Sequence, residues 1–188
     1  PLDGVRKPGS IGVPISNTDA KIVDLITGKP LPSGQIGELL VKGPQVMQGY
    51  WGQIDESDTV LKDGWLHTGD VAICDADGYF QIISRKRDTI MFAGYSVYPR
   101  DVEEVIYENN KVVEVAVVGV GMADDEPKVK AFVVPRAGSN LTKAELIDLC
   151  RRRLAPYAVP WEIEFRDELP KSFVGKVLRR MLVQDDSH

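Results

Sequence analysis

Three short polar segments contain the residue types that nucleotide and acyl chemistry require. The first ends in Thr68-Gly69-Asp70. Thr-Gly-Asp alone is a common polar turn, but a carboxylate at a strand edge can instead accept two hydrogen bonds from a ribose diol. His67 precedes this segment, and no carboxylate or nucleophile in the sequence is placed to make it a general base. We therefore interpret His67 as a structural residue or a pocket wall.

The second segment is a run of three bases, Arg85, Lys86 and Arg87. Such a run is usually a solvated surface loop. This one lies where a strand-rich pattern gives way to an α+β pattern, and a few residues at such a joint can absorb the backbone changes of a hinge. Gly94 follows shortly after it. A glycine permits close approach of a ligand or another backbone, although a plain turn is the ordinary role of a lone glycine.

The third segment is a Pro/Ser/Gly loop that ends in Lys176, just before a predicted final helix over 176–183. A lysine at a helix start is unfavourable for stability, because the helix N-terminus carries partial positive charge. The position therefore suggests phosphate chemistry, against the simpler interpretation of a loop lysine.

Two different patterns surround these segments. To about Ile83, short apolar runs broken by Gly, Pro and Asp predict a small β-barrel or distorted sheet, with a hairpin at Asp77-Gly78. After Ser84, helical and β-branched patterns predict a small α+β domain with a three-stranded sheet covered by helices. The fold class is therefore mixed, with a β-barrel-like subdomain over 1–86 and an α+β domain over 87–188. The predicted elements of the second part are a helix from Pro99, strands at 111–120, 128–134 and 161–165, a helix behind a Thr142/Glu145 capping box, and the final helix.

Composition excludes several classes of protein. The formal charge of −5 argues against a general nucleic-acid binder. No apolar run approaches the length that spans a bilayer, so we expect no integral membrane segment, while peripheral association stays open. The two cysteines, Cys74 and Cys150, suggest neither a metal site nor a disulfide framework, and a cytoplasmic setting is the simplest expectation. A start at Pro1 without Met suggests a piece of a longer protein.

Taken together, the order and spacing of the motifs resemble the adenylate-forming superfamily, which includes acyl-CoA synthetases, adenylation domains of peptide synthetases, and luciferases. The resemblance runs over essentially the whole chain. It includes GSIGVP (9–14), GELLVKGPQVMQGY (37–50) and DGWLHTGD (63–70). The segment GYSVYP (94–99) is more similar to acyl-CoA synthetases of the fatty-acid type than to the other members. The resemblance implies that the chain is the C-terminal part of such an enzyme.

The resemblance implies a role for each matching residue. Asp70 matches the aspartate that binds the ribose hydroxyls of ATP and AMP, and Arg85 matches an arginine that also contacts the nucleotide. Arg87 falls at the hinge position, where the family usually has Asp or Lys. Gly94 matches the glycine beside the pantetheine channel. Lys176 matches the lysine that bridges the acid carboxylate and the α-phosphate during adenylation.

The implied reaction uses ATP with Mg²⁺ to convert a carboxylic acid to an acyl-adenylate with release of pyrophosphate, and then CoA to form a thioester with release of AMP. Residues 1–86 would end the large adenylating domain, and 87–188 would be the mobile closing domain. The phosphate loop and most acid-binding residues of the family do not appear in the chain, so we expect the chain alone to be inactive. No metal ligands are assigned to it.

Three alternatives stay open. An aryl-acid ligase of the coumarate type and an adenylation domain that loads a carrier protein share the same motifs. A non-catalytic binding module with the same fold is the alternative from another class. The retained residues Asp70, Arg85, Gly94 and Lys176 argue against it, because a decayed copy has no physical need for the lysine.

Overall fold

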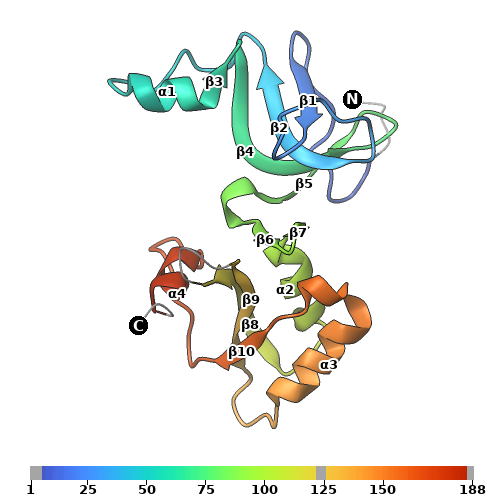
Figure 1. Cartoon of the computed structure of the whole chain (residues 1–188), viewed down its shortest axis with the longest axis vertical. Helices are drawn as coiled ribbons and strands as arrows, with labels where there is room; N and C mark the ends of the chain where they lie inside the picture. The colour runs from blue at the N-terminus through green and yellow to red at the C-terminus, as the bar shows by residue number, and fades with distance from the viewer. Residues whose placement is uncertain (1–5, 122–125, 186–188) are drawn as a thin grey trace. The chain divides into compact units, whose positions relative to one another are not determined.

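The computed structural model describes residues 6–121 and 126–185, which divide into two compact units, Pro1–Arg87 and Asp88–His188 (Figure 1). This division lies one residue after the one that the sequence predicts. Each unit has its own sheet and its own hydrophobic core.

The first unit is built on a curled antiparallel sheet whose longest strand is β4. Strand β4 pairs with β2 along one edge and with β3 and β5 along the other, while β1 pairs with the far side of β2. The elements are β1 (Asp19–Val23), β2 (Ile36–Lys42), α1 (Ile54–Val60), β3 (Leu61–Lys62), β4 (Trp65–Cys74) and β5 (Phe80–Arg85). Its small core is formed by Ile22, Leu39, Ala72 and Phe80.

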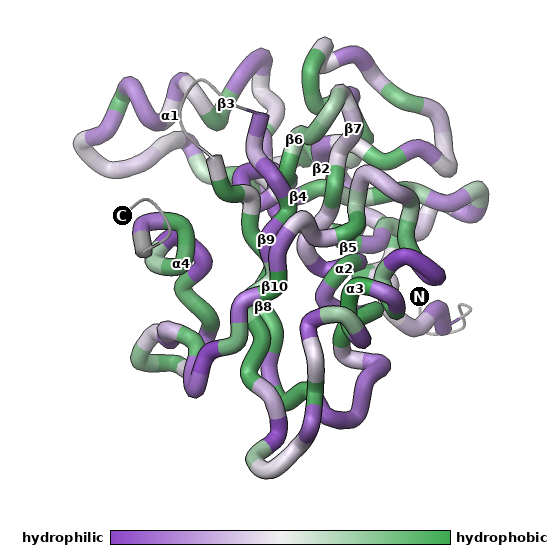
Figure 2. Tube along the Cα trace, turned by 60° about the horizontal axis from the view of Figure 1, so that its bottom comes forward, coloured by the Kyte–Doolittle hydropathy of each residue, from purple (hydrophilic) through white to green (hydrophobic). Residues whose placement is uncertain are grey.

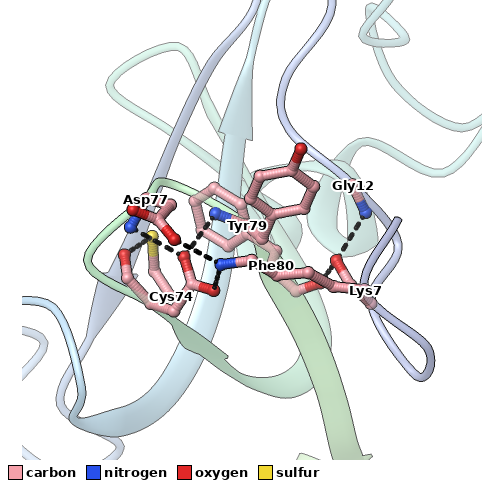
Figure 3. Close-up of polar contacts among 8 residues, drawn as sticks. Lys7, Gly12, Cys74, Asp77, Tyr79 and Phe80 are labelled. Atoms are coloured by element: carbon pink, nitrogen blue, oxygen red, sulfur yellow. Dashed lines mark hydrogen bonds and ion pairs between the residues drawn. The ribbon is translucent and has the colours of Figure 1, made fainter. Parts of the chain in front are cut away.

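An aspartate and a lysine fix the turn between β4 and β5. The Asp75 carboxylate accepts hydrogen bonds of 2.9 Å from the backbone N–H groups of Asp77 and Tyr79 (Figure 3). Lys7 Nζ lies 2.5 Å from the Asp75 carboxylate and 2.6 Å from that of Asp77. Gly78 takes the left-handed conformation, with φ +82°, that the turn requires. The hairpin that Asp77-Gly78 predicts is therefore confirmed.

The second unit is a three-stranded sheet in the order β10-β9-β8. Strand β9 is central, antiparallel to β8 and parallel to β10. The elements are η1 (Lys86–Asp88), which spans the unit boundary, β6 (Ile90–Phe92), β7 (Tyr95–Val97), α2 (Pro99–Tyr107), β8 (Val112–Val120), β9 (Lys128–Pro135), α3 (Lys143–Arg153), η2 (Pro156–Ala158), β10 (Glu162–Phe165) and α4 (Arg179–Asp185).

Helices cover both faces of this sheet, because alternate residues of a strand point to opposite sides. Val115 and Val117 of β8 pack in one core with residues of α2 and α3, while Ala116 and Val118 pack in another with Leu182 of α4. Figure 2 shows the hydrophobic residues that run along β8. A strand buried on both faces explains why the sequence reads here as a continuous β-branched run.

Two predicted details need correction. The final helix starts at Arg179 rather than at Lys176, because Gly175 at φ +80° and the backbone pairing of Lys171 with Val177 hold the preceding residues in a turn. The capping box is only half formed. Thr142 accepts a hydrogen bond from the Glu145 backbone N–H, but the Glu145 carboxylate binds Asn109 and Lys111.

Candidate functional site

The Thr68-Gly69-Asp70 segment is a bulge within β4 rather than a turn between strands. Residues 68–70 lie opposite the single residue Leu39 of β2, between the paired positions Glu38↔Val71 and Leu40↔His67. Thr68 Oγ1 donates to the Leu39 carbonyl (2.8 Å) and accepts from the Asp70 N–H (3.0 Å). Bulges re-aim side chains near functional sites, and this one fixes the backbone that carries Asp70.

Asp70 and Arg85 face each other on neighbouring strands. They are register partners of β4 and β5, and Arg85 Nη1 lies 2.8 Å from Asp70 Oδ1. Both side chains remain partly exposed, Asp70 at 23% and Arg85 at 56%. Two residues predicted from separate motifs thus form one ion pair that is accessible to solvent.

Glu38, which the sequence analysis did not single out, is the register partner of Val71, the residue after Asp70. Its side chain is only 5% exposed, and it lies 2.7 Å from Lys86 Nζ and 3.3 Å from His67 Nδ1. Burial would raise the pKa of Glu38, but the hydrogen bonds and positive charge of Lys86 and His67 outweigh burial and hold that pKa below its usual value. Glu38 therefore fixes Lys86, the residue between Arg85 and the predicted hinge. The signal in the sequence was an acid inside the apolar run GELLV.

His67 Nδ1 lies 3.3 Å from Glu38 Oε2. The structure therefore does place a carboxylate beside this histidine, which corrects the expectation from the sequence that none would lie there.

Arg87 is exposed and ends the first unit, in the short helix η1 that spans the boundary. The predicted hinge position therefore lies at the junction of the two units. Its neighbour Asp88 begins the second unit.

Gly94 occupies a tight turn between β6 and β7. Ala93 and Gly94 have φ of +50° and +78°, the pattern of a two-residue hairpin turn in which both central residues take positive φ. A Cβ built on Gly94 would meet no atom of the chain within 4 Å. The turn conformation, and not internal packing, therefore accounts for the glycine, and the space beside it is open.

A hollow of about 370 Å³ lies on the same unit. One of its walls, Tyr157, stacks on Tyr95, the residue after Gly94, with ring centroids 4.2 Å apart. Its other lining residues combine aromatic and basic side chains, with Lys128 Nζ 4.8 Å from the centre of the Trp161 ring. The complete lining is Phe92, Lys128, Val129, Arg151, Pro156, Tyr157, Val159 and Trp161.

Lys176 stands on an exposed loop that is closed by its own backbone. The Ser172 N–H donates to the Lys176 carbonyl (2.7 Å), and the Lys176 N–H donates to Ser172 Oγ (3.1 Å). Phe173 and Val174 at the tip of the loop are exposed at 104% and 68%. Lys176 itself is exposed, so its ammonium group is accessible to solvent.

The structure joins only some of the predicted site residues. Asp70 and Arg85 form one cluster in the first unit, whereas Gly94 and Lys176 occupy separate loops of the second. Across residues 6–121 and 126–185, no group of three or more His, Cys, Asp or Glu side chains could hold a metal ion, and no helix is long and apolar enough to cross a membrane.

Comparison with known proteins gives consistent matches along the chain. Residues 101–176 match the AMP-binding enzyme C-terminal domain, and residues 1–51 match the AMP-binding enzyme family. A long-chain-fatty-acid–CoA ligase from Escherichia coli O6:H1 is 50% identical over 97% of the chain, and a feruloyl-CoA synthase from an Amycolatopsis species is 44% identical over 93%. ATP-bound MatB from Rhodopseudomonas palustris superposes with a TM-score of 0.89 at 36% identity, covering 98% of the chain and 37% of that structure.

The chain is therefore similar over most of its length to AMP-binding enzymes, and it corresponds to the C-terminal part of long-chain-fatty-acid–CoA ligases. It spans about a third of the curated relatives it matches, 32% of the Escherichia coli ligase and 35% of the feruloyl-CoA synthase. The predicted fold class, a strand-rich, β-barrel-like subdomain followed by a small α+β domain with a three-stranded sheet covered by helices, is confirmed.

Proposed function

We propose that this chain is part of an ATP-dependent fatty-acid–CoA ligase. The intact enzyme forms an acyl-adenylate and pyrophosphate from the acid and Mg-ATP, and then an acyl-CoA thioester and AMP. Residues 1–86 complete its adenylating domain, and 87–188 form its mobile closing domain with Arg87 as the hinge. The observation that carries this proposal is the pairing of Asp70 with Arg85 at the end of β5, two residues from the unit boundary.

The chemistry of this pair suits a nucleotide ribose. Asp70 Oδ1 forms an ion pair with Arg85 Nη1 at 2.8 Å, and the carboxylate has further lone pairs that can accept hydrogen bonds from the two ribose hydroxyls. The guanidinium supplies fixed donors to the same sugar. Both side chains are partly exposed, so a nucleotide can reach them.

Lys176 is the adenylation residue in this proposal. Negative charge builds up around the α-phosphorus as the acid attacks, and a preplaced ammonium group stabilises it without solvent reorganisation. Because Lys176 lies on an exposed loop of the second unit, rotation about the hinge can withdraw it once the adenylate has formed.

The Gly94 turn serves the second half-reaction. Its missing side chain leaves open space at the surface, as passage of the pantetheine arm of CoA requires. The aromatic and basic hollow beside the same hairpin suits the nucleotide end of CoA, because a purine stacks on aromatic rings and phosphates attract Lys and Arg. One domain thus offers two faces to two successive reactions. Mg²⁺ enters with ATP, and we assign it no ligand among the described residues.

A comparison of the isolated chain with the full-length enzyme tests the proposal. We expect acid-dependent pyrophosphate release from the full-length enzyme with a fatty acid, and none from the 188-residue chain, because the phosphate loop and acid pocket of the family are not in it. If an enzyme-coupled assay detected pyrophosphate release by the chain alone, the proposal that the phosphate and acid sites lie outside this chain would be contradicted. A full-length enzyme that forms neither adenylate nor thioester would remove the proposed function itself.

Substitution of Gly94 separates the two half-reactions. We expect Gly94→Ala in the full-length enzyme to slow thioester formation from preformed acyl-adenylate by about 10- to 100-fold, since small displacements near reacting groups carry costs of this size. Pyrophosphate release should change little. The assay is single-turnover thioester formation with saturating CoA.

Gly138→Ala is a matched control for this experiment. Gly138 has φ +74° against +78° for Gly94, and a Cβ at either position meets no atom within 4 Å. Both alanines therefore carry similar backbone strain, roughly 1–2 kcal/mol. Equal loss of thioester formation in the two variants would assign the effect to strain and not to the CoA path.

An aryl acid is the second candidate for the substrate. The support for it is the 44% identity to a feruloyl-CoA synthase, while the higher identity of 50% to the long-chain ligase favours a fatty acid. Comparing kcat/KM for palmitate and ferulate in the full-length enzyme decides between the two. The setting we propose is the cytoplasm, because Cys74 and Cys150 are both free thiols.

A further inference from the structure

The loop that carries Lys176 is clamped at its base by two ion pairs of unequal quality. On one side, Lys171 pairs with Glu114 of β8, and both side chains are substantially exposed, at 40% and 29%. On the other, Arg179 Nη2 donates to both oxygens of Glu103 in α2, at 2.8 and 2.9 Å. Two charge-assisted hydrogen bonds from one guanidinium nitrogen to a buried carboxylate fix the side chains more firmly than an exposed ion pair does.

Glu103 is held in place before Arg179 reaches it. Its side chain is buried, and its Oε1 accepts a 2.9 Å hydrogen bond from the Val117 N–H of β8. Tyr107, one helical turn later, receives the Val115 N–H in the same way at 3.3 Å. Helix α2 therefore satisfies two outward N–H groups of the edge strand β8, and Glu103 is a rigid acceptor and not a mobile surface acid.

Arg179 also reaches the start of the second unit. Its Nη1 lies 3.6 Å from Oδ2 of Asp88, the residue that follows the proposed hinge. Arg179 is the first residue of α4 and lies three residues after Lys176. Its guanidinium thus connects the end of the Lys176 loop to helix α2 and to Asp88, where the chain leaves the proposed hinge. A lysine on a rotating domain arrives at its target accurately only if the path from pivot to lysine is stiff.

We propose that Arg179 is a positioning residue for adenylation, which acts through Lys176 by holding its loop to Glu103 and Asp88. The inference rests on the proposed function of Lys176. It concerns only the first half-reaction, because Lys176 has no role once the adenylate exists.

The test uses the full-length enzyme with Arg179→Ala and Arg179→Lys. We expect Arg179→Ala to lower kcat of acid-dependent pyrophosphate release by about 10- to 100-fold, with KM for ATP within about twofold, the size of effect that loop misplacement produces. Arg179→Lys should recover part of the loss, since it keeps the positive charge but loses the planar guanidinium that reaches both Glu103 and Asp88. Thioester formation from preformed adenylate should be unchanged in both.

Lys171→Ala is the matched control, because it removes the exposed ion pair of the same loop; we expect a change of at most about threefold. A merely structural role of Arg179 would lower both half-reactions together, and circular dichroism would report a loss of folded domain. Either result, or normal pyrophosphate release in a folded Arg179→Ala variant, overturns the proposal.

A double-mutant cycle separates this inference from the function on which it rests. If Arg179 acts through Lys176, Arg179→Ala should cost nothing further in the Lys176→Ala background. Full additivity contradicts the positioning role and leaves the function of Lys176 intact. If Lys176→Ala itself leaves pyrophosphate release unchanged, the assignment of the lysine fails and the role of Arg179 fails with it.

Discussion

Lys176→Ala in the full-length enzyme is expected to lower the rate of acyl-adenylate formation by about 10²- to 10³-fold, the typical cost of losing one preplaced charge contact to a transition state. Thioester formation from preformed acyl-adenylate should survive, because the proposed mechanism uses the lysine only while charge builds up at the α-phosphorus. The measurement pairs pyrophosphate release with a fatty acid against single-turnover thioester formation. Its expected signature is a collapse of the first with retention of the second.

Arg180→Ala provides the control for Lys176→Ala. Arg180 is an exposed base four residues further along the chain, in the first turn of α4, so its removal changes the local charge equally. Pyrophosphate release should stay near that of the unmodified enzyme. If the Lys176→Ala enzyme forms acyl-adenylate normally, the assignment of Lys176 to adenylation is wrong. The alternative of a non-catalytic binding module would then be favoured.

Asp70→Ala is expected to weaken both half-reactions, in contrast to Lys176→Ala. In the proposed mechanism, the carboxylate holds the ribose of ATP in the first step and the ribose of the adenylate in the second. Losing hydrogen bonds to a charged group costs roughly 1.5–3 kcal/mol, which corresponds to about a 10- to 150-fold rise in KM for ATP. Steady-state kinetics with varied ATP, and thioester assays with varied adenylate, measure the two effects.

Asp77→Ala is a suitable control for Asp70→Ala. Asp77 lies in the turn after the same strand, where its carboxylate is 72% exposed and pairs with Lys7. Its loss should leave KM for ATP unchanged. A rise for Asp77→Ala as large as that for Asp70→Ala would show that general damage to the β4–β5 hairpin, rather than ribose contact, is responsible.

Local chemistry made much of the fold predictable from the sequence. Asp77-Gly78 marked the β4–β5 hairpin because few other residues tolerate that turn, and Pro99 marked the start of α2 because its fixed φ suits a first helical turn. The β-branched runs became the buried strands β8 and β9. Each of these signals lies within a few neighbouring residues.

Long-range pairing escaped prediction. The bulge at residues 68–70 depends on how β4 aligns with β2, and no pattern within the Thr-Gly-Asp segment indicates that alignment. Glu38 and Glu103 were likewise missed, because their partners Lys86 and Arg179 lie 48 and 76 residues away. The site residues were found by resemblance, but the acids that hold their neighbours in place became visible only with the tertiary structure.

The contacts between α2 and β8 have a consequence beyond the Lys176 loop. An edge strand with unpaired N–H groups invites another chain to add a strand, and here Glu103 and Tyr107 occupy two of those groups. Helix α2 thereby reduces the chance that another chain pairs with the β8 edge of the sheet. Removing the Glu103 carboxylate would leave an N–H group of this edge strand unpaired and would also loosen the Lys176 loop. A Glu103 variant that loses activity must therefore also be examined for aggregation.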